Sequence, residues 1–100
     1  MPQITVVYWR DIPAQVIAKA GRTTAKRVLN ERFEKAIDRA AMRAGLRDTD
    51  SYLAEWRRAD PVECGADLEA EATAAAARLE AEFPEERLNQ FVMAGGKTPA

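Results

Sequence analysis

The segment from residue 3 to residue 9, QITVVYW, limits the fold more than any other part of the chain. It is a β-branched and aromatic run in which both sides of an extended chain are largely apolar. A strand with two apolar faces is typical of the centre of a sheet. We therefore predict a central strand here, with Tyr8 and Trp9 on opposite faces and at least one of them in the core.

Two more strands are expected, over residues 15–20 and 25–29. Pro13 ends the first strand or lies just past it, because proline cannot donate a hydrogen bond to a strand ladder. The Gly-Arg-Thr-Thr segment that begins at Gly21 is typical of a turn between the second and third strands.

The first helix is predicted from Glu31 to Ala44. An earlier start, at one of the threonines before it, would place two basic residues in the first turn, against the positive end of the helix dipole. With Asn30 as the cap, Glu31 and Glu34 occupy that turn and the charge is favourable. Gly45 follows the helix, as expected of a terminating glycine.

The sequence YLAEWRR, residues 52–58, has two interpretations. As a strand it places Tyr52 and Trp56 on one side, and as a short helix it groups both with the leucine between them. The aromatic content and the short length favour a strand. A second long helix is expected over residues 66–83, where an alanine-rich apolar stripe recurs at helical spacing, and Pro84 ends it.

These segments predict an α+β fold, with a small antiparallel sheet of three or four strands and two helices packed on one of its faces. We expect a single domain over residues 1–83, and a C-terminal extension over residues 84–100. That extension is expected to add a turn or two of helix over residues 85–93 and then to become disordered.

The charges divide sharply along the chain. Residues 1–47 carry ten Lys or Arg and four Asp or Glu, a balance of +6, and residues 48–100 carry five and twelve, a balance of −7. The halves neutralise each other inside the molecule, or each presents a face of one sign to a partner. The single cysteine, Cys64, excludes an internal disulfide and fits a reducing compartment. No apolar run is long enough for a membrane span and the N-terminus lacks a signal-peptide layout, so we expect a cytoplasmic protein without a membrane partner.

Few catalytic chemistries are open to this chain. It has no histidine, which removes histidine-based acid–base catalysis and histidine metal sites, and one cysteine cannot build a thiolate metal site. The Gly-Lys-Thr end at residues 96–98 lacks the first glycine of a phosphate-binding loop. We expect no cofactor, no metal and no stand-alone catalytic site. Asp11 or Asp38 remains a candidate acid or base in a site shared with a partner subunit.

The candidate binding residues are Trp9, Arg10, Asp11 and Gln15, at the turn after the first strand. Tryptophan and arginine are favoured anchors at protein interfaces, so these four residues are predicted to line a rim that recognises a partner or ligand. The alternative is that they only cap the end of the sheet. A protein partner is expected, and a homodimer that pairs the basic half with the acidic half is the second arrangement. A basic stripe, at Lys19, Arg22, Lys26, Arg27 and Arg32, would suit single-stranded nucleic acid, but the net charge of −1 argues against that partner.

The segments YWRDIPAQV and AIDRAAMRAG, followed by YLAEWRR, resemble the small bacterial virulence factor domain, which also forms part of the larger conserved virulence factor C proteins. The resemblance runs from Ile4 to Phe83. It implies bacterial origin and an accessory role inside the cell, and it supplies no catalytic residues to carry over. It also implies the alternative function, a small-ligand-binding or enzyme subunit in one-carbon or corrinoid methyl-transfer metabolism.

Overall fold

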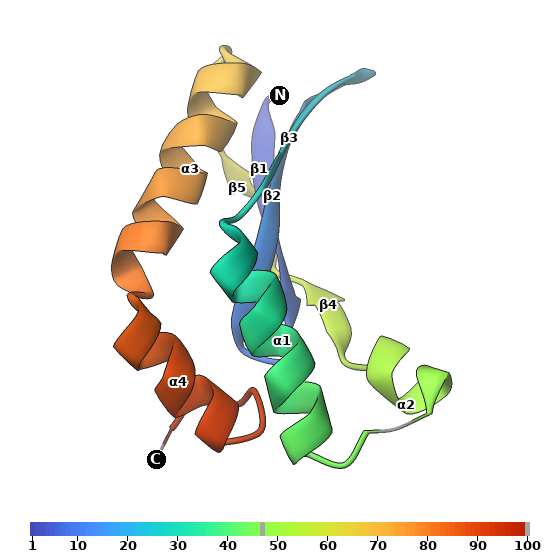
Figure 1. Ribbon diagram of the computed structural model, residues 1–100. Helices are drawn as coiled ribbons and strands as arrows, with labels where there is room; N and C mark the ends of the chain where they lie inside the picture. Colours follow the sequence, from blue (N-terminus) through green and yellow to red (C-terminus); the bar gives the residue numbers. More distant parts are fainter. Residues whose placement is uncertain (47, 100) are drawn as a thin grey trace.

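The computed structural model describes residues 1–46 and 48–99 of the chain. The N-terminal part of the chain is rich in strands, and the C-terminal part is mostly helical (Figure 1). In order they are β1 (Gln3–Trp9), β2 (Ile12–Ala20), β3 (Thr23–Val28), α1 (Glu31–Arg43), α2 (Thr49–Leu53), β4 (Trp56–Arg58), β5 (Val62–Glu63), α3 (Leu68–Glu82) and α4 (Glu85–Met93).

The strands form one antiparallel sheet in the order β3-β2-β1-β4, and β5 also pairs with β1. β1 is therefore central, with β2 on one side and β4 and β5 on the other, as its two apolar faces predict. Val6 of β1 lies opposite Val16 of β2, and Trp9 lies opposite Ile12. The predicted α+β class with a small antiparallel sheet is confirmed.

β2 begins at Ile12 rather than at residue 15, so Pro13 lies inside a strand instead of ending one. The pairing of β1 with β2 is irregular here, because Val7 faces Gln15 while Tyr8 faces Pro13. The shift leaves Ala14 as an extra residue, which makes a β-bulge. A bulge is one of the few places in a sheet where proline is tolerated, since a ladder hydrogen bond is already missing there.

Residues 52–58 divide between the two predicted interpretations. Tyr52 belongs to the short helix α2, which Asp48 caps by accepting a hydrogen bond from the backbone N–H of Ser51. Trp56 begins β4, which pairs with the end of β1. The prediction of one strand over the whole segment was therefore wrong for its first half. β5 and the start of β3 at Thr23 were also not predicted.

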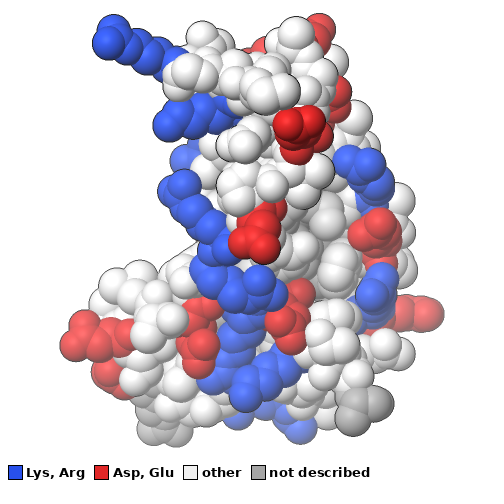
Figure 2. Space-filling view, turned by 180° about the vertical axis from the view of Figure 1, so that it is seen from behind, with Lys and Arg blue, Asp and Glu red and all other residues white. Residues whose placement is uncertain are grey.

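One face of the sheet is covered by α1 and α3. Val16 and Ala18 of β2 and Ala25 of β3 are buried there, and the small side chains of α3, such as Ala72, allow close approach to the strands. No helix among the described residues covers the opposite face, which we call the uncovered face, and the strand register places Lys19, Lys26 and Arg58 on it. Figure 2 shows this side of the molecule, with basic side chains running down it in a band and acidic side chains beside the band.

α4 follows α3 after a bend at Pro84 and lies beside α1 (Figure 1). Its side chains Leu88, Phe91 and Val92 are buried in the same core as Phe33 of α1. The segment predicted to be a C-terminal extension, residues 84–100, thus supplies part of the main core. No helix within residues 1–46 and 48–99 combines the length and the apolar character that crossing a membrane requires.

Candidate functional site

Trp9 is fully buried, with 0% of its surface exposed. Its indole N–H donates a hydrogen bond to the backbone carbonyl of Tyr52, at 3.0 Å, and the two rings stack with their centroids 5.7 Å apart. Trp9 therefore offers no surface to a partner in this structure, and its position fits the alternative in which it closes the end of the sheet.

Arg10 connects three parts of the chain. Its guanidinium donates to the carbonyl of Gly95 and to the carboxylate of Glu55, both at 2.9 Å, and lies over the ring of Trp9. Only 14% of its side-chain surface is exposed. The backbone of Arg10 has φ of 53°, a left-handed conformation that is uncommon for a residue with a side chain and that closes the tight β1–β2 turn.

Asp11 holds the C-terminal segment against the same turn. Its carboxylate accepts hydrogen bonds from the backbone N–H and the hydroxyl of Thr98, at 2.7 and 3.0 Å, and from Arg57, at 3.1 Å. Burial on its own raises the pKa of Asp11, but the hydrogen bonds from Thr98 and Arg57 outweigh it and hold the pKa below the ordinary value of 3.8. Asp11 thus acts as an ionised acceptor for groups of its own chain.

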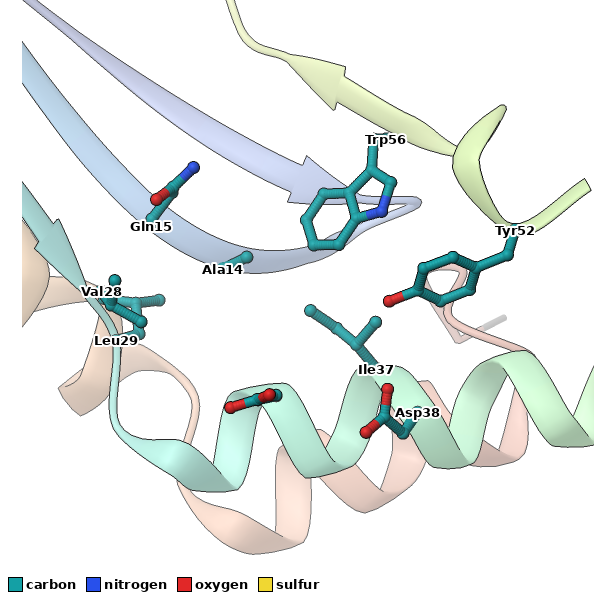
Figure 3. Close-up of a pocket in the computed structure, with 9 residues that line it drawn as sticks. Ala14, Gln15, Val28, Leu29, Ile37, Asp38, Tyr52 and Trp56 are labelled. Atoms are coloured by element: carbon teal, nitrogen blue, oxygen red, sulfur yellow. The ribbon is translucent and has the colours of Figure 1, made fainter. Parts of the chain in front are cut away.

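Gln15, the fourth residue of the predicted rim, is not part of this turn network. It lies on β2, one position beyond the bulge, and borders a concave site. We call this site the acidic groove; it encloses about 300 Å³ between β2, the end of β3, α1 and the α2–β4 segment (Figure 3). Its lining residues are Ala14, Gln15, Val28, Leu29, Glu34, Ile37, Asp38, Tyr52 and Trp56.

The floor of the acidic groove is apolar and one of its walls carries negative charge. Leu29 and Ile37 are buried beneath it. Glu34 and Asp38 are exposed and lie one helical turn apart on α1, on the same face of the helix. Within the described part of the chain, neither carboxylate takes part in an ion pair. Two like charges are therefore kept close together without a partner of opposite sign.

Tyr52 and Trp56 form the other side of the groove. Their rings meet edge to face, with centroids 6.1 Å apart and an angle of 82° between the ring planes, so they make two walls of a corner. Both residues are half-buried. Burial raises the pKa of the Tyr52 hydroxyl, and the negative charges of Asp38 and Glu34 raise it further. The two carboxylates therefore lie close enough to the aromatic corner for their charges to act on the Tyr52 hydroxyl.

A second concave site adjoins the first on the uncovered side of the sheet. We call it the basic hollow; it encloses about 430 Å³ and is lined by Val7, Gln15, Trp56, Arg57 and Arg58. Gln15 and Trp56 line both sites, so they form a ridge with negative charge on one side and positive charge on the other. Arg57 already pairs with Asp11, whereas Arg58 takes part in no ion pair among the described residues.

The sequence points to Gln15 as a binding residue and to Asp38 as a candidate acid or base, but nothing in it connects these two residues with Tyr52 or Trp56. One local signal was present, because Glu34 and Asp38 repeat the same charge at helical spacing. The contribution of Tyr52 and Trp56 has no such signal, since it depends on where the α2–β4 segment packs.

Other chemistry is sparse. Burial raises the pKa of the Cys64 thiol, and the negative charge of Glu71 adds to the shift, so both effects disfavour the nucleophilic thiolate form. Residues 1–46 and 48–99 contain no group of three or more acidic or cysteine side chains arranged to hold a metal ion.

A family model described as "Virulence factor" matches residues 7–92. The chain belongs to the virulence factor family. The match includes the β1–β2 turn, the residues that line the acidic groove and nearly all of α4, so it spans both the site and the core that supports it. It confirms the resemblance seen in the sequence and extends it past Phe83. No match was found among curated proteins or among solved structures.

Proposed function

We propose that this member of the virulence factor family is a non-catalytic accessory module of the bacterial cytoplasm, which binds a protein partner at the surface around Trp56. The observation that carries the proposal is the ridge of Gln15 and Trp56 between two hollows of opposite charge. Half-exposed tryptophan and tyrosine beside charged groups are typical of the anchor points of protein interfaces.

In this proposal the four residues of the predicted rim have two different roles, direct contact with the partner and support of the site. Gln15 contacts the partner directly. Trp9, Arg10 and Asp11 position the site through hydrogen bonds. Trp9 binds the Tyr52 carbonyl, while Arg10 and Asp11 bind Glu55 and Arg57, the residues on either side of Trp56. The binding residues and the turn are therefore coupled without sharing a surface.

The concave shape of the acidic groove supports a second candidate, a small-ligand-binding or enzyme subunit in one-carbon or corrinoid methyl-transfer metabolism, which the resemblance to the virulence factor family implies. A volume of about 300 Å³ is at the lower end of the range for small-molecule pockets, and polar groups converge on an apolar floor. The negative wall would select a small cation. The two candidates differ in whether binding also needs the ridge of Gln15 and Trp56 and the basic hollow beyond it.

Affinity purification followed by direct binding tests the first candidate. The baits are the wild type, Trp56→Ala and Met42→Ala; Met42 is exposed on α1 and lines neither site, so it is the control. Proteins that are lost only with Trp56→Ala are then purified, and their affinity for each bait is measured. We expect at least a tenfold loss of affinity for Trp56→Ala and no loss for Met42→Ala, since a buried aromatic anchor typically contributes about 2 kcal/mol or more.

A Trp9→Ala/Arg10→Ala bait completes the set, provided that circular dichroism shows it to be folded. If Trp56→Ala and the wild type bind every partner equally, the proposal is wrong. Sedimentation of the wild type alone tests for a homodimer. A dimer that Trp56→Ala converts to a monomer would identify the partner as a second copy, and the charge pairing of the halves predicts that added salt weakens that dimer.

A further inference from the structure

Arginine side chains lie over most of the aromatic rings of this protein. Of seven aromatic residues, five have a guanidinium within 4.5 to 5.7 Å of the ring centre. The pairs are Arg57 over Tyr8, Arg10 over Trp9, Arg32 over Phe33, and Arg87 over both Phe83 and Phe91. A cation over an aromatic face is favourable, the more so where water is partly excluded.

The two aromatic residues without such a partner among the described residues are Tyr52 and Trp56. These are the two that form the corner of the acidic groove. They face Asp38 across the groove (Figure 3), and Glu34 lines the same space. The rings without an arginine and the carboxylates without a cation are thus in one place.

We propose that the acidic groove binds an arginine side chain of the protein partner. The inference rests on the proposed function and adds the chemical group that the partner presents. The guanidinium plane lies against Trp56 or Tyr52, and its N–H groups donate to the carboxylates of Asp38 and Glu34. This arrangement repeats, with the partner's arginine, the contacts that Arg10 makes inside the chain with Trp9 and Glu55.

The groove favours arginine over other cations. A planar guanidinium can stack on an aromatic ring and still donate in its own plane to two carboxylates, whereas the ammonium of lysine is a compact and more strongly hydrated charge. The small volume of the groove suits one side chain rather than a larger ligand. Negative charge on its wall repels phosphate groups, which excludes nucleotides and nucleic acid from this site.

The surroundings favour an arginine that is part of a polypeptide. The ridge of Gln15 and Trp56 connects the groove with the basic hollow, and Val28 at the groove edge is 69% exposed. Residues on either side of the arginine therefore have a surface to lie on, including a positive one at Arg58. A free amine would use the groove and leave this surface empty.

A small blocked probe tests the inference directly. N-acetyl-arginine methylamide is titrated into isotope-labelled protein, and the signals of the two indole N–H groups and of the Gln15 amide are followed by NMR. We expect saturable shifts at Trp56 and Gln15. The matching citrulline derivative has nearly the same shape without the charge and is expected to bind at least tenfold more weakly; the lysine derivative is expected to lie between them.

The carboxylates are tested with a charge-matched pair of variants. Glu34→Gln/Asp38→Asn removes two charges inside the groove, and Glu82→Gln/Glu86→Gln removes two charges elsewhere on the surface. We expect the first variant to lose at least tenfold in affinity for the arginine probe and the second to bind like the wild type. Saturation with the probe should also lower the pKa of Tyr52, because a cation next to the hydroxyl stabilises the phenolate.

Equal binding of the arginine and citrulline probes overturns the inference. So does unchanged affinity in Glu34→Gln/Asp38→Asn, or the absence of shifts at Trp56 up to the solubility limit of the probe. These results are separate from the proposed function. If the arginine probe fails while Trp56→Ala still loses its protein partner, the partner-binding surface stands and only the arginine is wrong.

Discussion

The indole N–H of Trp9 donates a hydrogen bond to the backbone carbonyl of Tyr52, at 3.0 Å. A fully buried residue of the central strand thereby fixes the position of an aromatic wall of the acidic groove. The relationship explains why an apolar, aromatic segment at the N-terminus and a short helix in the middle of the chain contribute to one site. A substitution of Trp9 should therefore also change the position of Tyr52 in the acidic groove.

Trp9→Phe removes this hydrogen bond and part of the buried ring. We expect the free energy of unfolding in urea to fall by about 2 kcal/mol, from the lost hydrogen bond and the space left in the core. The control is Trp56→Phe, at a half-exposed position, which should cost less than about 1 kcal/mol. Equal costs for the two variants would contradict the central role of Trp9.

Gly96 packs closely against the ring of Trp9. A Cβ built on it would lie 2.6 Å from Cζ3 of the Trp9 ring, and its φ is +93°. Gly96→Ala therefore combines backbone strain with overpacking, and we expect a loss of about 3 kcal/mol in the free energy of unfolding. Gly21→Ala is the matched control, because Gly21 also has positive φ but has nothing within 4 Å of its Cβ position. It should lose about 1 kcal/mol, from strain alone. A loss for Gly96→Ala no greater than this would show that the contact with Trp9 costs nothing.

The C-terminal segment should be released by acid. The pKa of Asp11 is subject first to burial, which raises it, and then to hydrogen bonds from Thr98 and Arg57, which bring it below 3.8 in the folded chain. A pKa that is lower in the folded state gives stability that is present above 3.8 and is lost as the pH falls through the folded-state pKa. The difference in unfolding free energy between the wild type and Asp11→Asn should therefore be constant near neutral pH and shrink below pH 3.8.

Thr98→Val tests the source of this effect, since it removes the hydroxyl donor and keeps the backbone donor. The difference in unfolding free energy between the wild type and Thr98→Val should therefore show part of the pH dependence expected for Asp11→Asn. If the difference between the wild type and Asp11→Asn does not change with pH, the ionised form of Asp11 does not stabilise the fold.

Tyr52 should titrate at higher pH than a free tyrosine. Burial raises its pKa above the ordinary 10.0, and Asp38 and Glu34 add to the shift. In a Tyr8→Phe background, where Tyr52 is the remaining tyrosine, tyrosinate absorbance reports this pKa alone. We expect Glu34→Gln/Asp38→Asn to lower the pKa of Tyr52 part of the way back, because the burial is kept. A pKa that does not respond to the two substitutions would mean that the carboxylates are too far from the aromatic corner to act on it.

α4 should be required for folding. Leu88 is 2% exposed and lies in the main core with Phe33 and Phe91. Leu88→Ala is expected to lower the free energy of unfolding by about 3 kcal/mol, while Asn89→Ala, next to it on the exposed side, should change it by less than about 0.5 kcal/mol.

Truncation tests the role of the whole C-terminal segment. A chain ending at residue 83 lacks three core residues of α4 and also Gly96, which packs against Trp9. Circular dichroism and tryptophan fluorescence should therefore show loss of the fold. A stably folded fragment would support the domain boundary that the sequence suggested.

The charge division of the sequence is partly resolved inside the molecule. Arg10 pairs with Glu55, and Arg27 pairs with Glu69, so cations of the first half meet carboxylates of the second. Arg27 of the basic stripe considered in the sequence faces α3, whereas Lys19 and Lys26 lie on the other side of the sheet. Net charge along the sequence did not show which of these groups remain available to a partner.

The sequence by itself determined the features that depend on neighbouring residues. The two apolar faces of residues 3–9 marked the central strand, Asn30 capped α1 as expected, and the spacing of alanines placed α3. These signals are local, because strand alternation, helix periodicity and capping involve residues a few positions apart. The family resemblance could likewise be read from short segments.

Only the tertiary structure decided what the residues of the β1–β2 turn do. The partners of Arg10 lie 45 and 85 positions away, at Glu55 and Gly95, and the acidic groove joins residues from β2, α1 and the α2–β4 segment. A tryptophan next to an arginine has the same local pattern whether it is exposed at an interface or buried under a distant glycine. Whether the tryptophan is buried depends on which distant segments pack over it. Packing between distant segments depends on the shapes of the surfaces in contact, and it produces no periodic pattern in the sequence.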